Sequence, residues 1–258
     1  MFPDIAFFDA IAEAAAAETL PRFRMPVAID NKHASGFDPV TEADRAAEKA
    51  IRQLITERYP EHGILGEEHG DVGLDRDYVW VIDPIDGTRA FISGLPVWGT
   101  LVGLYHKGKA VMGMMDQPFT GERFIAKPGE ATVKRNGETS RLSTRKGVSL
   151  DQAIMMTTSP AIFSEELEPS YKRVESRVQL ARYGCDCYAY AMVASGHIDL
   201  VVEADLKPYD VGGLIPLVEQ AGGVMTTWSG GRPEMGGTIV ASGSAALHET
   251  VLELLNRR

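Results

Sequence analysis

The sequence has few cysteines and no long hydrophobic run. Its two cysteines, Cys185 and Cys187, stand two positions apart in a chain of 258 residues. That spacing is poorly suited to a disulfide framework, and so few thiols fit a reducing cytosol. No hydrophobic run reaches about 18 residues, so we expect no membrane span. The N-terminus also lacks a basic segment followed by a hydrophobic run, so we expect no signal peptide and a cytoplasmic location.

Positive charge is scarce as well. The chain has 26 Lys and Arg against 36 Asp and Glu, which gives a formal net charge of −10. This balance disfavours nucleic acid and anionic membranes as partners. An anionic substrate is still allowed, because a bound metal ion can reverse the local field. The six histidines are scattered, and no Cys/His partner pair has metal-ligand spacing, so no soft-metal site is predicted.

The overall composition is ordinary for a globular protein, with 44% hydrophobic and 24% charged residues. Residues 5–19 and 42–58 lack helix breakers and predict helices, and residues 26–37 predict a loop with an extended piece. Short hydrophobic runs between residues 63 and 134 predict a meander of strands, so the first half indicates an α+β arrangement.

The second half alternates predicted strands and helices, which indicates an α/β arrangement. One predicted helix spans residues 211–221 and contains Pro216, where we expect a kink or an irregular first turn. The polar segment 140–149 is a candidate boundary. We therefore predict an N-terminal lobe over residues 1–145 that carries most metal ligands. The C-terminal lobe, over residues 146–258, would carry Asp210 and the residues that determine specificity.

The most informative stretch runs from Val79 to Thr88. A hydrophobic run typical of a buried strand ends in Asp83 and Asp86, which are three positions apart. Carboxylates in such a place are costly unless a cation neutralises them, and a hard divalent ion takes oxygen ligands. Gly87 would let a backbone N–H approach a phosphate closely, and a helix that starts there would offer more donors.

Two further acids follow predicted strands or begin predicted helices. Glu67 comes after the run 63–66, and Asp210 ends the sequence Lys-Pro-Tyr-Asp. Any one such acid alone is usually a helix cap or a solvated loop residue. Four of them, with Asp83 able to bridge, favour two Mg²⁺ or Mn²⁺ ions. Such sites clamp both the attacking and the leaving oxygen of a phosphoryl group, so the residues suggest metal-assisted hydrolysis of a phosphate ester.

Several motifs together resemble the inositol monophosphatase family. Residues 80–88 (Trp-Val-Ile-Asp-Pro-Ile-Asp-Gly-Thr) resemble its first signature, and residues 208–213 followed by 219–223 resemble its second, with Tyr209 where a tryptophan is common. Residues 66–68 and 41–44 also fall where the family has a metal-ligand glutamate and a water-activating aspartate. The resemblance covers roughly residues 5–255. It implies a homodimer and a layered αβαβα sandwich of the inositol monophosphatase and fructose-1,6-bisphosphatase type.

The resemblance also implies a set of metal ligands. Glu67, Asp83 and the Ile85 carbonyl would hold the first magnesium ion, and Glu67 also counts among the catalytic residues. Asp83, Asp86 and Asp210 would hold the second. A third, weaker ion could use Glu67 and water, and manganese could replace magnesium.

The resemblance implies catalytic roles for the neighbouring residues. Asp44 and Thr88 would orient and deprotonate a metal-bound water for in-line attack on phosphorus. The backbone N–H groups of Gly87 and Thr88 would bind phosphate oxygens. Thr41 and Asp44 also resemble a capping box, so Asp44 could instead be a helix cap. Both roles can hold, because one carboxylate has two oxygens.

The substrate-side residues depart from the inositol-specific pattern. The segment from Arg89 to Trp98 resembles the branch that hydrolyses histidinol phosphate, and Arg89 could contact the substrate or lie on the surface. Asp186 stands where inositol-type members have an alanine, and Glu203 aligns with the family's substrate-contacting glutamate. Together these two acids could hold the amine of L-histidinol phosphate, since a carboxylate suits an ammonium group better than a polyol. Asp186 could instead cap the helix predicted over 188–194.

We therefore predict a magnesium-dependent phosphomonoester hydrolase, a histidinol-phosphate phosphatase of histidine biosynthesis that acts on a small phosphate ester. The first alternative is an inositol-1-phosphate or broad-specificity sugar phosphatase. The second is an inactive, phosphatase-like interaction module, which would be expected to have lost a metal acid, whereas all four are present. A nucleotide 3′-phosphatase would need base-holding residues that the sequence does not reveal.

Overall fold

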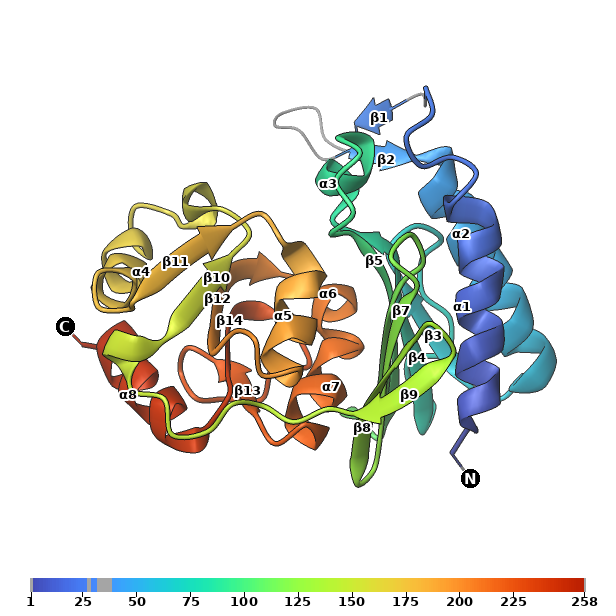
Figure 1. Ribbon diagram of the computed structural model, residues 1–258. Coiled ribbons are helices and arrows are strands. Elements are labelled where there is room, and N and C mark those ends of the chain that lie inside the picture. The colour runs from blue at the N-terminus through green and yellow to red at the C-terminus, as the bar shows by residue number, and fades with distance from the viewer. Residues whose placement is uncertain (1, 27–28, 32–38, 258) are drawn as a thin grey trace.

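The computed structural model describes residues 2–26, 29–31 and 39–257. Helices α1 (Ile5–Thr19) and α2 (Glu42–Arg58) lie side by side on the outer face of a seven-stranded sheet. A middle layer of helices separates this sheet from a five-stranded sheet, and two more helices cover the far side (Figure 1). These layers confirm the predicted αβαβα sandwich. The predicted loop 26–37 falls mostly outside the described residues, apart from β1 (Ile29–Asn31), which pairs with β2 (Pro39–Thr41).

The seven-stranded sheet is the predicted meander. Its strands lie in chain order, with β3 parallel to β4 and every later pair antiparallel. The strands are β3 (Gly63–Gly66), β4 (Tyr78–Asp86), β5 (Gly99–His106), β6 (Lys109–Gln117), β7 (Glu122–Lys127), β8 (Glu130–Arg135) and β9 (Glu138–Arg141). The predicted turn at Asn136-Gly137 is confirmed, with positive φ at both residues. Strand β9 was not predicted, because its residues are polar and all exposed.

Helices α1 and α2 bury one face of this sheet. The carboxylate of Asp4 caps α1, and Thr41 and Asp44 form the predicted capping box at the start of α2. The helices pack Phe8 and Ile51 against Trp80 and other side chains of the central strands, all removed from water. This burial holds the two helices in place, and it leaves the opposite face of the sheet for the middle layer.

The five-stranded sheet has the order β11-β10-β12-β14-β13. Its strands are β10 (Ile154–Thr157), β11 (Leu180–Tyr183), β12 (Leu200–Leu206), β13 (Val224–Thr227) and β14 (Gly237–Ser242). Strands β10, β11 and β12 are parallel, as alternation with helices predicts, whereas β13 and β14 run antiparallel to their neighbours. Helices α4 (Glu168–Glu175) and α8 (Ala245–Leu255) cover its outer side (Figure 1), and the short turns η1 (Leu150–Gln152) and η2 (Pro160–Ile162) precede and follow β10 along the chain.

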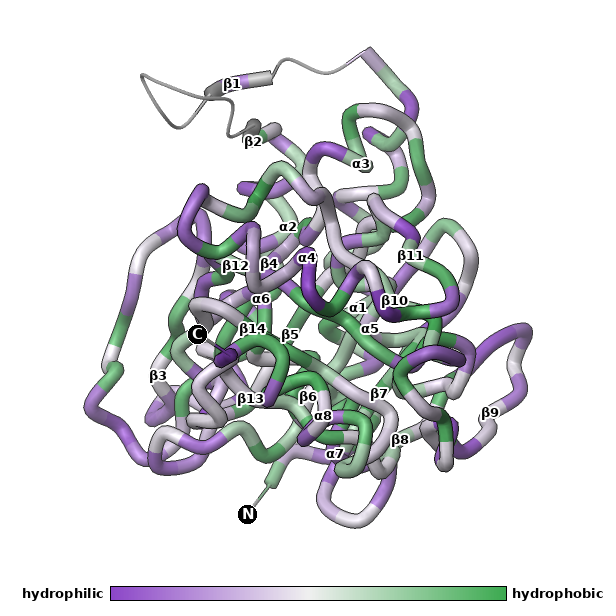
Figure 2. Tube along the Cα trace, turned by 90° about the vertical axis from the view of Figure 1, so that its left-hand side faces the viewer, coloured by the Kyte–Doolittle hydropathy of each residue, from purple (hydrophilic) through white to green (hydrophobic). Residues whose placement is uncertain are grey.

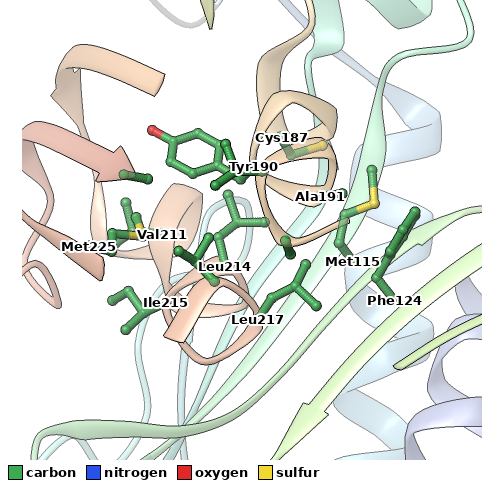
Figure 3. Packing of buried hydrophobic residues seen from close by; sticks show 14 of the residues in the cluster. Met115, Phe124, Cys187, Tyr190, Ala191, Val211, Leu214, Ile215, Leu217 and Met225 are labelled. Carbon is green, nitrogen blue, oxygen red and sulfur yellow. The ribbon is translucent and has the colours of Figure 1, made fainter. Parts of the chain in front are cut away.

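The middle layer consists of α5 (Asp186–Ala194), α6 (Pro208–Gly212) and α7 (Leu214–Gln220). A hydrophobic cluster around these helices includes Met115 and Phe124 from one sheet and Met225 from the other (Figure 3). Figure 2 shows the same division along the chain, with hydrophobic residues on inner elements such as β5, β14 and α5 and hydrophilic residues on outer loops. Because one cluster joins both sheets, the division into lobes at residue 145 stays a prediction.

The helix predicted over residues 211–221 is interrupted, at Gly213 rather than at Pro216, where a kink or an irregular first turn was expected. The chain breaks between α6 and α7 at Gly213, and Pro216 lies in the first turn of α7, where its missing N–H is not needed. The break lets backbone pack on backbone, because a Cβ on Gly113 of β6 would overlap the carbonyl of Gly213. In the described part of the chain, no helix is both long and apolar enough to cross a membrane.

Candidate active site

A cleft of about 730 Å³ lies where the end of β4 meets the start of α5, the end of β12 and helix α6. Its walls contain all but one of the predicted site residues. These are Glu67, Asp83, Ile85, Asp86, Gly87, Thr88, Arg89, Asp186, Glu203 and Asp210. The exception is Asp44, which is buried on α2 with only 1% of its surface exposed. The fold therefore brings together residues up to 143 positions apart, from Glu67 to Asp210.

An irregularity in β4 places two of the acids together. Residues three apart on a regular strand point to opposite faces, but the pairing of β4 with β5 shifts register between Asp83 and Asp86. The Thr100 hydroxyl fixes this bulge by donating to the Pro84 carbonyl at 2.8 Å. As a result, Asp83, Asp86 and Asp210 each offer a carboxylate oxygen within 4.8 Å of the others.

The electrostatics of this acid cluster favour a cation. Burial raises the pKa of Asp83 and Asp86 well above the usual range, and the charges of Glu67, Asp86 and Asp210 add to the effect on Asp83. Burial raises the pKa of Asp210 to about 7, although the Lys207 N–H donates to its carboxylate at 2.6 Å. Several carboxylates held this close repel one another, and oxygen donors of this kind suit Mg²⁺. The donor set therefore fits a hard divalent ion.

The residues after the bulge start helix α3 (Thr88–Ile92). Gly87 has a φ of +82°, a conformation that glycine adopts without strain. The Thr88 hydroxyl donates to the Ile85 carbonyl at 3.2 Å, so the proton of Thr88 is engaged and its oxygen can still accept. A Cβ on Gly87 would lie 3.0 Å from Asp186 Oδ2, so the Asp186 side chain packs directly on this glycine.

Asp86 also joins the two halves of the cleft, which the sequence did not predict. Its Oδ2 accepts a hydrogen bond from the Cys187 N–H at 2.7 Å, at the first turn of α5. A carboxylate in this position satisfies a helix donor and interacts favourably with the helix dipole. The sequence contains the segments around Asp86 and Cys187 as two separate motifs, and neither motif indicates that the two segments meet.

Asp44 forms its predicted cap and keeps one oxygen unpaired. Its Oδ2 accepts hydrogen bonds from the Thr41 N–H at 2.8 Å and from the Thr41 hydroxyl at 2.6 Å. Its buried Oδ1 has no hydrogen-bond partner among the described residues. Burial raises the pKa of Asp44 to about 6, and the nearby charge of Glu67 contributes to the same shift. The cap alternative is therefore confirmed, and it leaves one oxygen available for a second role.

Glu48 supports the segment that carries Glu67, and the sequence analysis missed it. Its fully buried carboxylate accepts hydrogen bonds from the Glu68 N–H at 2.7 Å, the His69 N–H at 3.1 Å and Arg52 Nε at 2.6 Å. A Cβ on Gly66 would overlap this carboxylate and the Arg52 guanidinium. Glu48 lies three positions before Ile51 and seven before Ile55, on the buried face of α2, so its helical spacing was a signal that a charged residue is buried there.

Asp186 is not the helix cap that one alternative predicted. Helix α5 begins at Asp186 itself, two residues earlier than predicted, and no side-chain cap bond is found there within the described chain. Asp186 has a φ of +42°, in the left-handed region where aspartate and asparagine are tolerated best. Burial raises its pKa, while a hydrogen bond from the Thr158 side chain and the charge of Arg89 lower it. The exposed Arg89 therefore lies beside Asp186 at the mouth of the cleft.

Glu203 lies in the middle of β12, where the register shift begins, with 2% of its surface exposed. Its Oε1 accepts a hydrogen bond from the Thr158 N–H at 2.6 Å, and its Oε2 has no partner within the described part of the molecule. Burial raises its pKa to about 8. The cleft thus contains the acid cluster, with Asp186 beside Asp86 and Gly87, and Glu203 on β12.

Comparisons with known proteins agree with this geometry. The profile of the inositol monophosphatase family matches residues 4–258. A bifunctional phosphatase, IMPL2, chloroplastic, from Arabidopsis thaliana is 45% identical over 258 residues, which cover 96% of this chain and 73% of the relative. A histidinol-phosphatase from Chlorobaculum parvum is 31% identical, with 98% of this chain and 96% of the relative covered.

A solved structure supports the same assignment. An inositol monophosphatase from Zymomonas mobilis superposes with a TM-score of 0.86 at 39% identity, over 98% of this chain and 97% of that one. The profile match, these relatives and the layered fold agree with one another. The chain therefore belongs to the inositol monophosphatase family, a family of phosphoric monoester hydrolases whose enzymes use Mg²⁺.

Proposed function

We propose that this protein is a magnesium-dependent phosphatase whose preferred substrate is L-histidinol phosphate. The observation that carries the proposal is that two further acids, Asp186 and Glu203, line the cleft in addition to the acid cluster. One group of acids suits the metal and the phosphate, and the other suits a positively charged group on the same substrate.

The acid cluster and its surroundings supply the parts of a hydrolytic site. Glu67, Asp83, Asp86 and Asp210, with the Ile85 carbonyl, would hold two to three ions, and Mn²⁺ could replace Mg²⁺. Bound magnesium would lower the pKa of water and neutralise charge on the phosphoryl group. The backbone N–H groups of Gly87 and Thr88 would hold phosphate oxygens, as such groups do at the start of a helix.

Two side chains would handle the attacking water in line with the leaving oxygen. The Thr88 oxygen would accept a hydrogen bond from this water, because its own proton is donated to Ile85. Asp44 would receive the water's proton at Oδ1, the oxygen that the Thr41 cap leaves unpaired. A positioned general base of this kind contributes roughly 10²- to 10⁴-fold to a hydrolytic rate.

On the substrate side, Glu203 and Asp186 would hold the amine of the ester, and Arg89 would contact the substrate at the mouth of the cleft. An ammonium group donates three hydrogen bonds and carries a positive charge that attracts the two carboxylates, whereas a polyol hydroxyl is neutral. The name of the Chlorobaculum relative supports this choice.

The alternative substrate is inositol 1-phosphate or another sugar phosphate. The name of the Zymomonas structure favours it, and the Arabidopsis relative is named a bifunctional phosphatase. An inactive interaction module is disfavoured, because all four metal acids are present and three of them converge. The homodimer, the cytoplasmic location and the place in histidine biosynthesis stay predictions.

The deciding experiment compares kcat/KM for L-histidinol phosphate and inositol 1-phosphate at saturating Mg²⁺. We expect the amine-bearing ester to be preferred, and we expect Asp186→Asn, which suits a positive φ, to reduce that preference. The matched control is Asp205→Asn, since Asp205 lines the cleft but is exposed and pairs with Lys207. Equal or better use of the inositol ester by the unaltered protein would overturn the proposal.

A further inference from the structure

Three buried polar atoms around Glu203 lack hydrogen-bond partners within the described chain, and two of them belong to residues that line the cleft. They are Thr157 Oγ1 on β10, Tyr190 Oη on α5 and Glu203 Oε2 on β12. The exposed fractions of these residues are 1%, 3% and 2%. Nearly all buried polar groups in native proteins are paired, so three unpaired atoms in one neighbourhood require an explanation.

The three atoms come from elements that pack together. Strands β10 and β12 are adjacent and parallel, and α5 packs against both. The Thr157 side chain lies close enough to the Glu203 carboxylate to lower its pKa, and among the charges that raise the pKa of Tyr190 that of Glu203 is the largest. In Figure 3 the Tyr190 ring belongs to the hydrophobic cluster, and its hydroxyl lies at the edge of that cluster, pointing away from Met115 and Phe124. Tyr190 and Glu203 both line the cleft.

The Tyr190 hydroxyl has no structural use in this position. A buried hydroxyl without a partner destabilises the folded state, whereas phenylalanine would give the same ring packing without that cost. The nearby Tyr188 shows the ordinary arrangement, because its hydroxyl donates to Glu122 at 2.6 Å. The Tyr190 hydroxyl, which is buried at the cleft wall, is therefore suited to a ligand.

The available acceptors match one chemical group. Glu203 Oε2, Tyr190 Oη and Thr157 Oγ1 can each accept a hydrogen bond, and a primary ammonium group has three protons to donate. No ion pair to Glu203 is found among the residues that the structure describes, whereas Asp186 already has the charge of Arg89 beside it. A neutral hydroxyl could donate to one of these oxygens, but it would not supply the positive charge that stabilises the ionised form of Glu203.

We propose that Tyr190 determines specificity by accepting a hydrogen bond from the substrate's ammonium group, together with Glu203 and Thr157. This inference rests on the proposed function, because it requires a substrate that carries both a phosphate ester and a primary amine. It places the main amine contact around Glu203 and leaves Asp186 at the mouth.

The test uses Tyr190→Phe and two esters, L-histidinol phosphate and its des-amino analogue, imidazolylpropyl phosphate. We expect the substitution to lower kcat/KM for the amine-bearing ester by about 10- to 100-fold, the range for a hydrogen bond to a charged group. Turnover of the des-amino ester should not change. The melting temperature should hold or rise, because an unpaired hydroxyl has been removed.

The control is Tyr188→Phe, on the same helix, which should leave the preference between the two esters unchanged. A Tyr190→Phe protein that loses activity on both esters alike, or on neither, would overturn the inference and leave the proposed function standing. An unaltered protein that hydrolyses both esters equally well would overturn the proposed function itself, and the inference with it. The preference between the esters thus separates the two failures.

Discussion

The two ends of the cleft are built alike and differ in charge. In each sheet, the strand that reaches the cleft shifts register against its neighbour, between Asp83 and Asp86 in β4 and between Glu203 and Leu206 in β12. Each irregularity presents buried carboxylates to the cleft. At the β4 end, Glu67 and two other acids surround Asp83, whereas at the β12 end Glu203 meets a backbone N–H and two unpaired hydroxyls.

This difference indicates what each end binds. Burial is the largest cause of the raised pKa at both ends, but only at the β4 end do several close acids add their charges. A cluster of carboxylates needs a multivalent ion, and a single buried carboxylate needs one cationic or donor group. The β4 end is therefore suited to the reaction and the β12 end to the choice of substrate.

The largest effect is expected from Asp83→Asn at the β4 end. Removing the acid that both ion sites share should lower kcat on every ester by more than about 100-fold. This loss exceeds the one expected when a residue that only orients a metal ligand is mutated. The metal-free protein should at the same time melt at a higher temperature near neutral pH, because like-charge repulsion has been relieved. Steady-state kinetics and thermal melting measure the two effects.

The control is Asp77→Asn, just before the opposite end of β4, where an exposed aspartate lies 3.7 Å from the Lys107 ammonium. It should change neither quantity. An Asp83→Asn protein that loses activity on only one ester would contradict the assignment of the reaction to the β4 end and of substrate choice to the β12 end.

A smaller loss is expected from Glu48→Gln. The amide can no longer accept all three hydrogen bonds that fix the Glu67 segment, so kcat/KM should fall about 10- to 100-fold on all esters alike. The Mg²⁺ concentration for half-maximal rate should rise. Glu57→Gln, exposed on the same helix, is the matched control. An unchanged Mg²⁺ requirement would show that Glu48 only stabilises the fold.

The smallest effect concerns pH and the stability of the metal-free protein. The folded pKa values of Asp44, Asp210 and Glu203 lie at about 6, 7 and 8, above their unfolded values. The folded state therefore holds protons that the unfolded state releases, and stability falls as pH rises through these values. The melting temperature should be about 5 °C lower at about pH 8.5 than at about pH 6.5.

Magnesium should remove the part of this difference that comes from Asp210, because it replaces the protons of the acid cluster. The remainder should disappear in Glu203→Gln, which has no carboxyl left to titrate at the β12 end. A metal-free protein that becomes more stable as pH rises over this interval would contradict the assignment of buried, protonated acids.

The sequence predicted much of the fold and the catalytic motif, because both depend on local patterns. Hydrophobic spacing was sufficient for α1, α2 and the meander, and the run that ends in Asp83 identified the acid cluster. The sequence could not predict that the chain breaks between α6 and α7 at Gly213. That break depends on how closely α6 and α7 pack on β5 and β6, which Gly103 and Gly113 permit.

The residues that sequence reasoning missed act across the fold. Glu48 reaches the Glu67 segment from α2, and Asp86 accepts a hydrogen bond from Cys187 on the other side of the cleft. The ring of Tyr190 is part of the hydrophobic core. Only the absence of a partner for its hydroxyl in the described structure sets it apart. No periodicity or motif carries that information.

The most direct test of the account is the substrate preference of Glu203→Gln. The amide oxygen can keep the Thr158 hydrogen bond, while its NH₂ group would replace Oε2 and repel an ammonium group. We predict that kcat/KM falls about 10- to 100-fold for L-histidinol phosphate and is retained for inositol 1-phosphate, whose hydroxyl can accept from the amide. Equal loss on both esters would contradict the claim that the β12 end selects the substrate.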